Sequence, residues 1–322
     1  MLLSSTKRAG KIAREVLAIG RKNIPIVRDL AEALKYKPKV LIIDIAPPGG
    51  QLTETWKRIV EKAIRSKLDT VSGLHFFLGD QPRFVSLAKK YRTKFYDVRK
   101  PPKDLSILTG KARDLKLPVV AVLSTDATAG KNVAIVELMR EAKKRGYEPG
   151  FVATGQRTIT LRCDAGAVID AIPGDFNSGQ TEKMVVGAAA MRKDIIFVEG
   201  QASLSHPTYG QESPSILYGS WPDAIVPVHD PFRKSRDGFP RFTVPEPNDE
   251  IRIIETVCPK TKVVAVAING DQKPDEEVKA AMKRVADETN LPTTDAVRFG
   301  VSELFDVLMR RLESVGKPLP VK

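Results

Sequence analysis

The sequence contains few of the cysteine and histidine residues that stabilise small folds through disulfides or bound metal ions. Cys163 and Cys258 are its only cysteines, which excludes a disulfide framework and a thiolate metal cluster. We expect both to be buried small hydrophobic residues rather than reactive thiols. The three histidines lie far apart without the spacing of a zinc site, so we expect no metal site.

Long apolar runs are also missing. No stretch approaches the roughly 20 apolar residues that a membrane-spanning helix needs. The first residues have no apolar core of the signal-peptide kind, and the basic residues follow Met1–Leu3 rather than precede it. We expect a cytoplasmic protein without a membrane partner.

The formal net charge of +13 is not accompanied by any nucleic-acid motif. There is no zinc finger, RNP-type aromatic motif or dense basic arm. Lysine and arginine are spread along expected helices among acids, as at Lys57-Arg58 and Lys283-Arg284, which is typical of solvated faces. We therefore expect no nucleic-acid partner, and a positive field that favours small anions such as phosphates, coenzyme A or carboxylates.

The length and the periodicity indicate an α/β protein of about two domains. The first third alternates helix and strand in a βαβαβ order typical of a small Rossmann-like domain. Its proline-rich, charged segment 99–104 is the best linker candidate, so we divide the chain into 1–110 and 111–322. The expected helices are 25–35, 82–91 and one between them that Trp56, Ile59, Val60 and Ala63 trace, with Thr53 or Thr55 as its cap. The expected strands are 40–45, 74–78 and 94–98.

The second domain shows the pattern of a three-layer parallel sheet. The polar segment 201–222 is rich in Gly, Pro and Ser, and a loop of that length inside an α/β domain is usually functional. The expected strands are 119–123, 150–154, 167–172, 195–198, 224–228 and 263–268, and the expected helices cover 135–142, 278–285 and 304–312.

The most informative segment runs from Leu117 to Val133, where an apolar strand, a small-residue turn and a Gly-Lys pair precede a helix. These are the parts of a P-loop, in which backbone N–H groups, a lysine and a helix N-terminus hold a phosphate. Asn132 stands where Mg²⁺-dependent nucleotide hydrolases carry Ser or Thr, so we do not expect a conventional NTPase. The residues assigned to cofactor binding are Thr125, Ala127, Thr128, Ala129, Gly130, Lys131 and Asn132.

Asp126 lies inside this loop, where a bare carboxylate repels an anionic ligand. It either shapes the loop or takes part in the chemistry, and the sequence leaves both open.

Further polar residues follow the expected strands, and ligands of open α/β sheets sit beyond the carboxyl ends of strands. Glu199 ends an apolar strand at a position like Walker B, which suits metal ligation or general-base work. Asp175 follows the expected strand 167–172, and His206 and His229 follow the next two strands. His75, in the first domain, is the weaker candidate.

Arginines near these strand ends suit a carboxylate substrate. Arg157 follows the strand at 150–154, and Arg233 follows His229. Either guanidinium can hold a carboxylate with two hydrogen bonds.

Several motifs together resemble those of the D-glutamate N-acetyltransferase family, long known as a domain of unknown function. That family joins a Rossmann-like domain to a P-loop domain related to dethiobiotin synthetase. The match covers nearly the whole chain and keeps the order of the motifs. The motifs are Ser124-Thr-Asp-x-x-x-Gly-Lys131, Phe151-Val-Ala-Thr-Gly-Gln156, Val198-Glu-Gly-Gln201, His206-Pro207 and the strand end at His229.

The resemblance implies acetyl transfer from acetyl-CoA to D-glutamate or a similar small anionic amino acid, and a homo-oligomer is common among such enzymes. The assigned catalytic residues are Glu199, His206, Asp126 and Asp175, and the assigned substrate-binding residues are Gln156, Arg157, Gln201, Ser203, His229 and Arg233.

The chain departs from the family pattern at Ser124, at Asn132-Val133 and at Ala202. No Gly-x-Gly-x-x-Gly supports a dinucleotide-dependent activity. Two alternatives stay open. One is a kinase or ligase that uses ATP with Mg²⁺ bound by Asp126 and Glu199, and the other is a nucleotide- or CoA-binding protein without catalysis.

Overall fold

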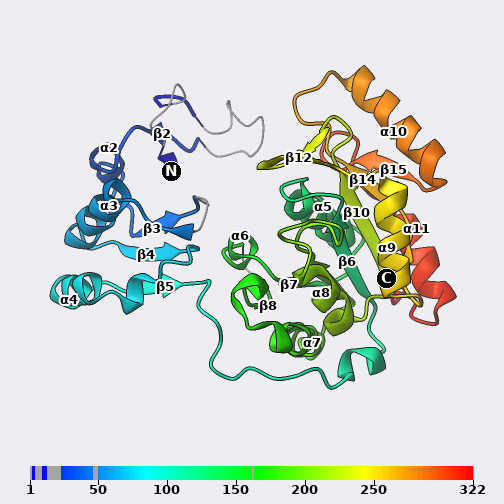
Figure 1. The fold of residues 1–322 in the computed structure, drawn as a ribbon, viewed down its shortest axis with the longest axis horizontal. Helices are drawn as coiled ribbons and strands as arrows, with labels where there is room; N and C mark the ends of the chain where they lie inside the picture. The colour runs from blue at the N-terminus through cyan, green and yellow to red at the C-terminus, as the bar shows by residue number, and fades with distance from the viewer. Residues whose placement is uncertain (1, 4–8, 13–22, 46–49, 162, 322) are drawn as a thin grey trace. The chain divides into compact units, whose positions relative to one another are not determined.

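The computed structural model describes residues 2–3, 9–12, 23–45, 50–161 and 163–321. The chain separates into two compact units, residues 1–100 and 101–322. Figure 1 shows the elements of each unit. Both are parallel-sheet α/β structures, as the sequence predicts. The division falls ten residues before the expected one.

The first unit is built on the parallel sheet β3-β4-β5. Its strands are Val40–Ile43, Asp69–Ser72 and Phe95–Asp97, and helices α3 (Glu54–Arg65) and α4 (Pro82–Tyr91) connect them. The described residues of this unit also form β1 (Leu2–Leu3), β2 (Ile26–Val27), α2 (Leu30–Leu34) and a 3₁₀ turn at Leu78–Asp80.

Two predictions in this unit are wrong. The strand expected at 74–78 is β4, five residues earlier. The buried face of β4 consists of the polar residues Thr70 and Ser72, so the strand has no apolar pattern in the sequence. The helix expected at 25–35 shrinks to α2 because Ile26 and Val27 pair with β1 and Asp29 caps the helix. Of the two threonines expected as caps of α3, Thr53 is the one that caps it, since its hydroxyl accepts from the Trp56 N–H at 3.5 Å.

The second unit contains an eight-stranded sheet in the order β15-β14-β10-β6-β9-β7-β8, with β13 also paired to β10. All its pairings are parallel. The strands are β6 (Val119–Ser124), β7 (Pro149–Ala153), β8 (Ala165–Gly166), β9 (Ile195–Glu199), β10 (Ala224–His229), β13 (Lys262–Val263), β14 (Val266–Ile268) and β15 (Thr293–Asp295).

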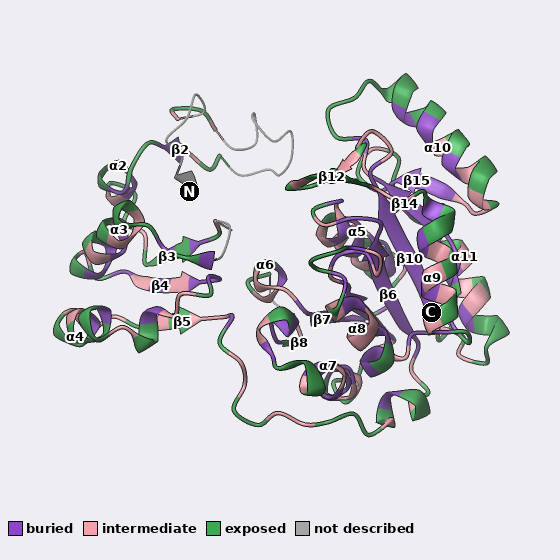
Figure 2. Ribbon diagram, viewed as in Figure 1, coloured by how far each residue is buried: buried purple, intermediate pink, exposed green. Residues whose placement is uncertain are grey.

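Helices cover the sheet, and Figure 2 shows its strands buried among helices whose outer faces are exposed. Strands β6, β9 and β10 are buried at every residue, which explains their continuous apolar sequences. The helices are α5 (Lys131–Lys144), α6 (Gln156–Ile159), α7 (Gly174–Ala189), α8 (Glu212–Ser220), α9 (Pro247–Val257), α10 (Asp275–Thr289) and α11 (Ser302–Ser314). A hairpin of β11 (Ser235–Arg236) and β12 (Phe239–Thr243) lies outside the sheet.

Three predictions in this unit are also wrong. The strand expected at 167–172 is replaced by the two-residue β8 and a short 3₁₀ turn at Ile169–Ala171. Asp175 consequently lies in the first turn of α7, where it is exposed, and does not follow a strand. The polar segment 201–222 is not all loop, because α8 forms at its end and buries Ile216 and Leu217.

Residues 104–110 belong to the second unit because they are bound to α7. The Thr109 N–H and hydroxyl both donate to Glu182 Oε2 at 2.7 Å. The Lys183 ammonium donates to the Asp104 carboxylate. Gly179 lets this segment approach the helix, since a Cβ there would stand 2.0 Å from the Ser106 carbonyl oxygen. Within the described residues, no helix combines the length and apolar composition required to cross a bilayer.

We predict that Gly179→Ala lowers the free energy of unfolding by about 1–3 kcal/mol, because the added methyl group forces the segment off α7. Gly187→Ala on the same helix is the control, since a Cβ there meets nothing within 4 Å. It should stabilise the protein by about 0.5–1 kcal/mol through helix propensity. Urea denaturation measures both, and equal effects of the two substitutions would contradict the packing.

Candidate functional site

The P-loop predicted from the sequence connects β6 to α5. Thr128 and Gly130 have left-handed backbones, with φ of 54° and 111°, which turn the chain into the helix. The Lys131 side chain is buried and its Nζ donates to Ser124 Oγ at 3.0 Å. Burial lowers the pKa of Lys131 to about 8, although Glu199 and Asp126 nearby oppose that shift. An ammonium held out of water in this way gains strongly from a bound anion.

Asp126 is a buried hub, by which we mean a carboxylate that several polar groups of the protein surround. Its side chain is completely inaccessible, and its Oδ2 accepts from Arg233 Nη1 and from the Asp237 N–H, both at 3.0 Å. Its Oδ1 lies 3.6 Å from both His206 Nε2 and Arg236 Nη1. The first of the two open interpretations therefore fits the geometry: Asp126 shapes the loop.

The β11–β12 hairpin provides the partners of this carboxylate. Arg233, just before the hairpin, also donates to the Ala127 carbonyl at 2.8 Å. Asp237, at its turn, accepts from the Thr128 hydroxyl at 2.7 Å. The hairpin is thus fastened to the P-loop through Asp126, Ala127 and Thr128.

Arg236 is a site residue that the sequence analysis missed. It is buried, and it donates to Ser203 Oγ at 2.8 Å and to Ser205 Oγ at 2.9 Å. The same Ser205 hydroxyl donates to buried Glu250 of α9 at 2.6 Å. The Asp237-Gly238 pair is a sequence signal for a hairpin turn and could have located this arginine.

His206 is hydrogen-bonded at Nδ1, whereas Nε2 is buried with no hydrogen-bond partner among the described residues. Its Nδ1 accepts from the Thr208 and Tyr209 N–H groups at 3.1 and 3.0 Å, so the proton of the neutral ring lies on Nε2, facing Asp126. Burial, and then the Arg236 charge, lower the pKa of His206. Its ring stacks on Tyr209 with centroids 4.9 Å apart. A histidine held in this way is poorly placed to accept a proton from a substrate.

Glu199 ends β9, beside the turn that follows β7. Its Oε2 accepts from the N–H groups of Thr154 and Gly155 at 2.8 and 2.9 Å, and from the Thr158 hydroxyl. Burial raises the pKa of the carboxyl above its usual range. A Cβ on Gly155 would lie 3.2 Å from Oε1, so the absence of a side chain there leaves room beside this oxygen.

The other assigned residues surround these groups. Gln201 Nε2 donates to the Thr154 carbonyl and hydroxyl, both at 2.9 Å. His229 Nδ1 pairs with the Thr125 hydroxyl at 2.9 Å, and burial lowers its pKa to about 4, so the ring is neutral. Gln156 and Arg157 begin α6, directly after Gly155, and Arg157 is exposed. Asn132 is half-buried in the first turn of α5, and Ala129 is buried in the loop.

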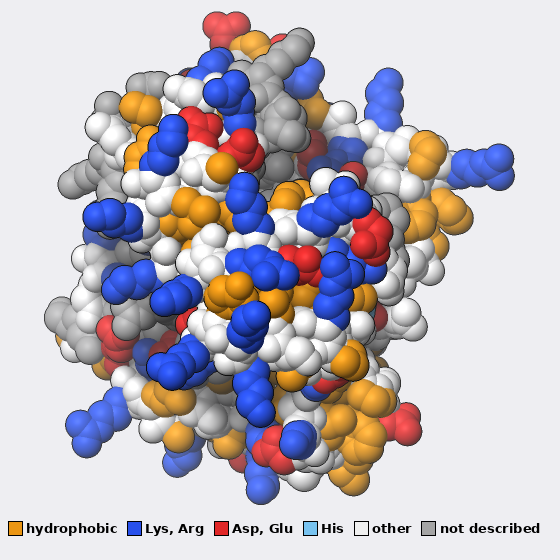
Figure 3. Space-filling model, turned by 90° about the vertical axis from the view of Figure 1, so that its left-hand side faces the viewer, with side chains coloured by type: hydrophobic (Ala, Val, Ile, Leu, Met, Phe, Trp, Pro, Cys, Tyr) orange, Lys and Arg blue, Asp and Glu red, His pale blue; other side chains and the backbone are white. Residues whose placement is uncertain are grey.

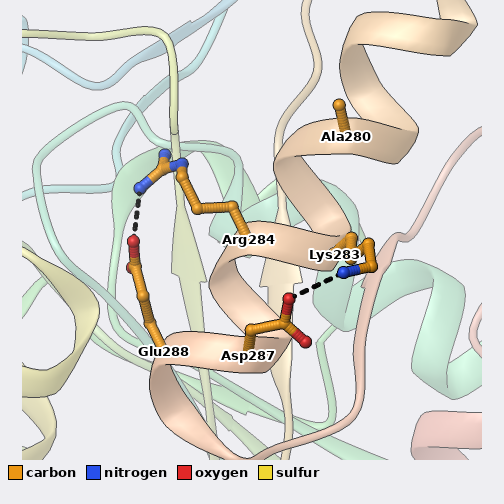
Figure 4. A pocket seen from close by; sticks show the side chains of 5 residues that line it. All are labelled: Ala280, Lys283, Arg284, Asp287 and Glu288. Atoms are coloured by element: carbon orange, nitrogen blue, oxygen red, sulfur yellow. Dashed lines mark hydrogen bonds and ion pairs between the residues drawn. The ribbon is translucent and has the colours of Figure 1, made fainter.

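Cys258 is buried as expected, whereas Cys163 is only half-buried. Burial raises the pKa of both thiols, that of Cys258 to about 11. In the part of the chain that the structure describes, no group of three or more His, Cys, Asp and Glu side chains is placed to hold a metal ion. A surface pocket on α10 is lined by Ala280 and four charged residues (Figure 4). Lys283 pairs with Asp287 and Arg284 with Glu288, both at 3.0 Å. The charges that line this pocket therefore neutralise one another along the helix.

Comparisons with known proteins cover both units. Residues 6–101 match the Rossmann-like N-terminal domain of DUF1611, a domain of unknown function, and residues 106–305 match its P-loop domain. A D-glutamate N-acetyltransferase from Tritonibacter scottomollicae is 31% identical over 87% of this chain and 84% of its own length. One from a Pseudoalteromonas species is 32% identical over 85% and 82%. The crystal structure of a DUF1611 family protein from Anabaena variabilis has a TM-score of 0.88 at 35% identity, covering 94% of this chain and 89% of that one.

We predict that Asp126→Asn lowers the free energy of unfolding by about 3–5 kcal/mol, because it leaves buried arginine charge without its counter-charge. Asp230→Asn is the control. Its carboxylate also meets Arg233, at 3.3 Å, but the Asp230 side chain is 12% exposed whereas that of Asp126 is fully buried, so the loss should be about 1 kcal/mol. Urea denaturation at pH 7 measures both, and a near-neutral Asp126→Asn would contradict the role of hub.

Proposed function

The chain belongs to the DUF1611 family, and we propose that it is an N-acetyltransferase that transfers the acetyl group of acetyl-CoA to the amino group of D-glutamate or a similar acidic amino acid. The observation that carries this proposal is the buried Glu199 carboxyl of raised pKa at the strand end beside the P-loop. The named relatives support the choice of reaction, since they match both units over most of their length.

The P-loop residues fit a phosphate-bearing donor. Lys131 and the N–H groups at the start of α5 provide positive charge for the pyrophosphate of CoA. Acyl transfer from a thioester needs no hydroxyl ligand for Mg²⁺, which agrees with Asn132 in the position after the lysine. The Asp126 carboxylate accepts hydrogen bonds from Arg233 and the Asp237 N–H, so its negative charge is balanced by groups of the protein.

Glu199 is the general base in this proposal. The carboxylate takes a proton from the substrate amine as nitrogen attacks the thioester carbonyl, the C–N bond forms, and the C–S bond breaks to release CoA. A raised pKa improves a carboxylate as a base near neutral pH. The three hydrogen bonds to Oε2 fix its orientation, and Gly155 leaves room at Oε1.

Arg157 is the arginine we assign to a substrate carboxylate. It begins α6 two residues after Gly155, whose N–H binds Glu199, so it lies on the same turn as the base. Arg233 is less suited because its Nη1 already serves Asp126 and Ala127. An arginine can hold a carboxylate with two parallel hydrogen bonds.

We predict that Glu199→Gln lowers kcat by about 10²–10⁴-fold, because the amide cannot accept the proton, while acetyl-CoA still binds. The comparison is His206→Asn, whose side-chain oxygen can replace Nδ1 as the acceptor, and whose kcat should fall less than about tenfold. Thiol release from acetyl-CoA in the presence of D-glutamate measures turnover. The reverse order of the two variants would assign the base to His206.

We predict that acetyl-CoA binding weakens about tenfold between pH 7 and pH 9. Lys131 has a pKa of about 8 in the folded protein, below its usual value, so it is mostly charged at pH 7 and mostly neutral at pH 9. Isothermal titration calorimetry measures the affinity. In Lys131→Met the affinity should be lower at pH 7 and nearly independent of pH, and an unchanged pH dependence would remove Lys131 from the site.

The same binding experiments separate the alternatives. ATP binding that requires Mg²⁺, with no binding of acetyl-CoA, would replace the proposal by a kinase or ligase. Saturable CoA binding without turnover of D-glutamate, L-glutamate or D-aspartate would replace it by a non-enzymatic binding protein.

A further inference from the structure

The formal charge of +13 is divided very unevenly between the two units. Residues 1–100 carry 22 Lys and Arg against 9 Asp and Glu, whereas residues 101–322 carry 30 of each kind. The whole net charge therefore belongs to the first unit, and the unit with the P-loop is neutral overall.

The fold gathers part of this charge at one edge of the sheet β3-β4-β5. The strands are parallel and in register, so they begin at the same edge. The residues just before them are Lys37 and Lys39 (β3), Lys67 (β4), and Arg92 and Lys94 (β5), which we call the basic edge. Neighbouring strands lie about 4.8 Å apart, so these side chains leave the protein close together.

The basic edge is open, and its cations outnumber the Asp69 carboxylate, which accepts from the Lys94 N–H at 2.8 Å. All five side chains belong to exposed residues, and none of them forms an ion pair within the described chain. Lysine and arginine in the last turns of α3 and α4 add to the same edge. Figure 3 faces the side of Figure 1 from which the arrows of β3 and β4 start, and basic side chains outnumber acidic ones across it.

The second unit treats comparable positions differently. Arg145, at the end of α5, pairs with Glu141 at 2.8 Å and also with Asp306. Lys193, just before β9, pairs with Asp164 at 2.8 Å and Glu148 at 3.4 Å. Arg145 and Lys193 are thus neutralised, whereas Arg192, also just before β9, is exposed.

Three residues of the basic edge occupy strained positions. Lys37, Lys67 and Arg92 have φ of 50°, 61° and 57°, in the left-handed region that favours glycine or asparagine after a helix. The second unit has Gly146 and Asn290 in such turns, with φ of 87° and 54°, and also one arginine, Arg192, with φ of 52°. Stabilisation of the α4 dipole does not explain Arg92, because Lys89 and Lys90 in the last turn of the helix already provide positive charge there.

Aromatic rings lie among the cations of this edge. Tyr36, between Lys35 and Lys37, is 58% exposed. The Tyr91 ring has the Arg65 guanidinium at 5.8 Å and the Lys90 ammonium at 6.0 Å from its centroid. Fixed cations with exposed aromatic faces are the features by which proteins bind single-stranded nucleic acid, through phosphates and stacked bases.

We propose that the basic edge of the first unit binds the phosphate backbone of single-stranded nucleic acid, with Tyr36 stacking on a base. A lipid surface is the less favoured partner, because mobile headgroups adapt to any arrangement of charge and gain nothing from cations fixed in strained turns. The inference departs from the expectation drawn from the sequence, where these residues are scattered among acids and only the fold brings them together. It does not depend on the proposed transferase activity.

The test uses substitutions that remove charge and strain together. Arg92→Gly deletes a cation of the basic edge at φ 57°, and Arg192→Gly deletes an exposed arginine at φ 52° in the neutral unit. Both should keep or slightly raise Tm, since glycine suits the left-handed backbone. The probe is a fluorescein-labelled 20-nucleotide oligouridine, and fluorescence anisotropy measures its binding to the full chain between 50 and 200 mM NaCl.

We expect Arg92→Gly to weaken binding several-fold and Arg192→Gly to change it by less than twofold. The triple variant Lys37→Gly, Lys67→Gly, Arg92→Gly should weaken binding by tenfold or more and reduce the salt slope by about 2, at about 0.7 per lost single-strand phosphate contact. Tyr36→Ala should weaken binding without changing the salt slope.

Three results would overturn the proposal. One is the absence of saturable binding at 50 mM NaCl, and another is an equal effect of Arg92→Gly and Arg192→Gly. The third is displacement of the labelled oligonucleotide by phosphatidylserine vesicles but not by unlabelled RNA. That result would assign the basic edge to lipid binding. Acetyl transfer by the triple variant, measured in parallel, should equal that of the wild type whichever result is obtained.

Discussion

The geometry of the candidate site depends on one buried carboxylate. Asp126 is sealed from solvent and bonded to Arg233 and to the Asp237 backbone, and it faces His206 and Arg236. A buried charge is tolerated only when partners surround it, so the P-loop, the hairpin and the loop around His206 must all be in place together. The result is a site whose positive groups are positioned by the protein's own anion before any ligand arrives.

The sequence predicts the strands and the loop that carry this site well, because these elements are encoded by short continuous patterns of residues. The apolar strands β6, β9 and β10 and the Gly130-Lys131 pair are visible as short continuous patterns. Glu199 was found from its place at a strand end. The role of Asp126 could not be decided, because its partners lie more than 100 residues away along the chain. Arg236 and Glu250 were missed for the same reason, since each contacts the loop near His206 from a distant element.

One source of error is elements whose inward face is not apolar. Strand β4 buries Thr70 and Ser72, and α7 buries Asn177, Gln180 and Glu182. Hydrophobic periodicity cannot reveal such elements. Asp175 was placed at a strand end only because Ala167–Ile172 reads as a strand, whereas the chain makes two residues of β8 and a 3₁₀ turn there.

The long separation between Asp126 and its partners also bears on how the site comes into being. Contacts between residues so distant in sequence carry a large loop-closure entropy and form late in folding. A nascent chain that ends before Arg233 already contains β6, the Gly130 turn and α5, but the carboxylate of Asp126 lacks its counter-ions. The P-loop therefore acquires its final contacts only after the hairpin has been synthesised.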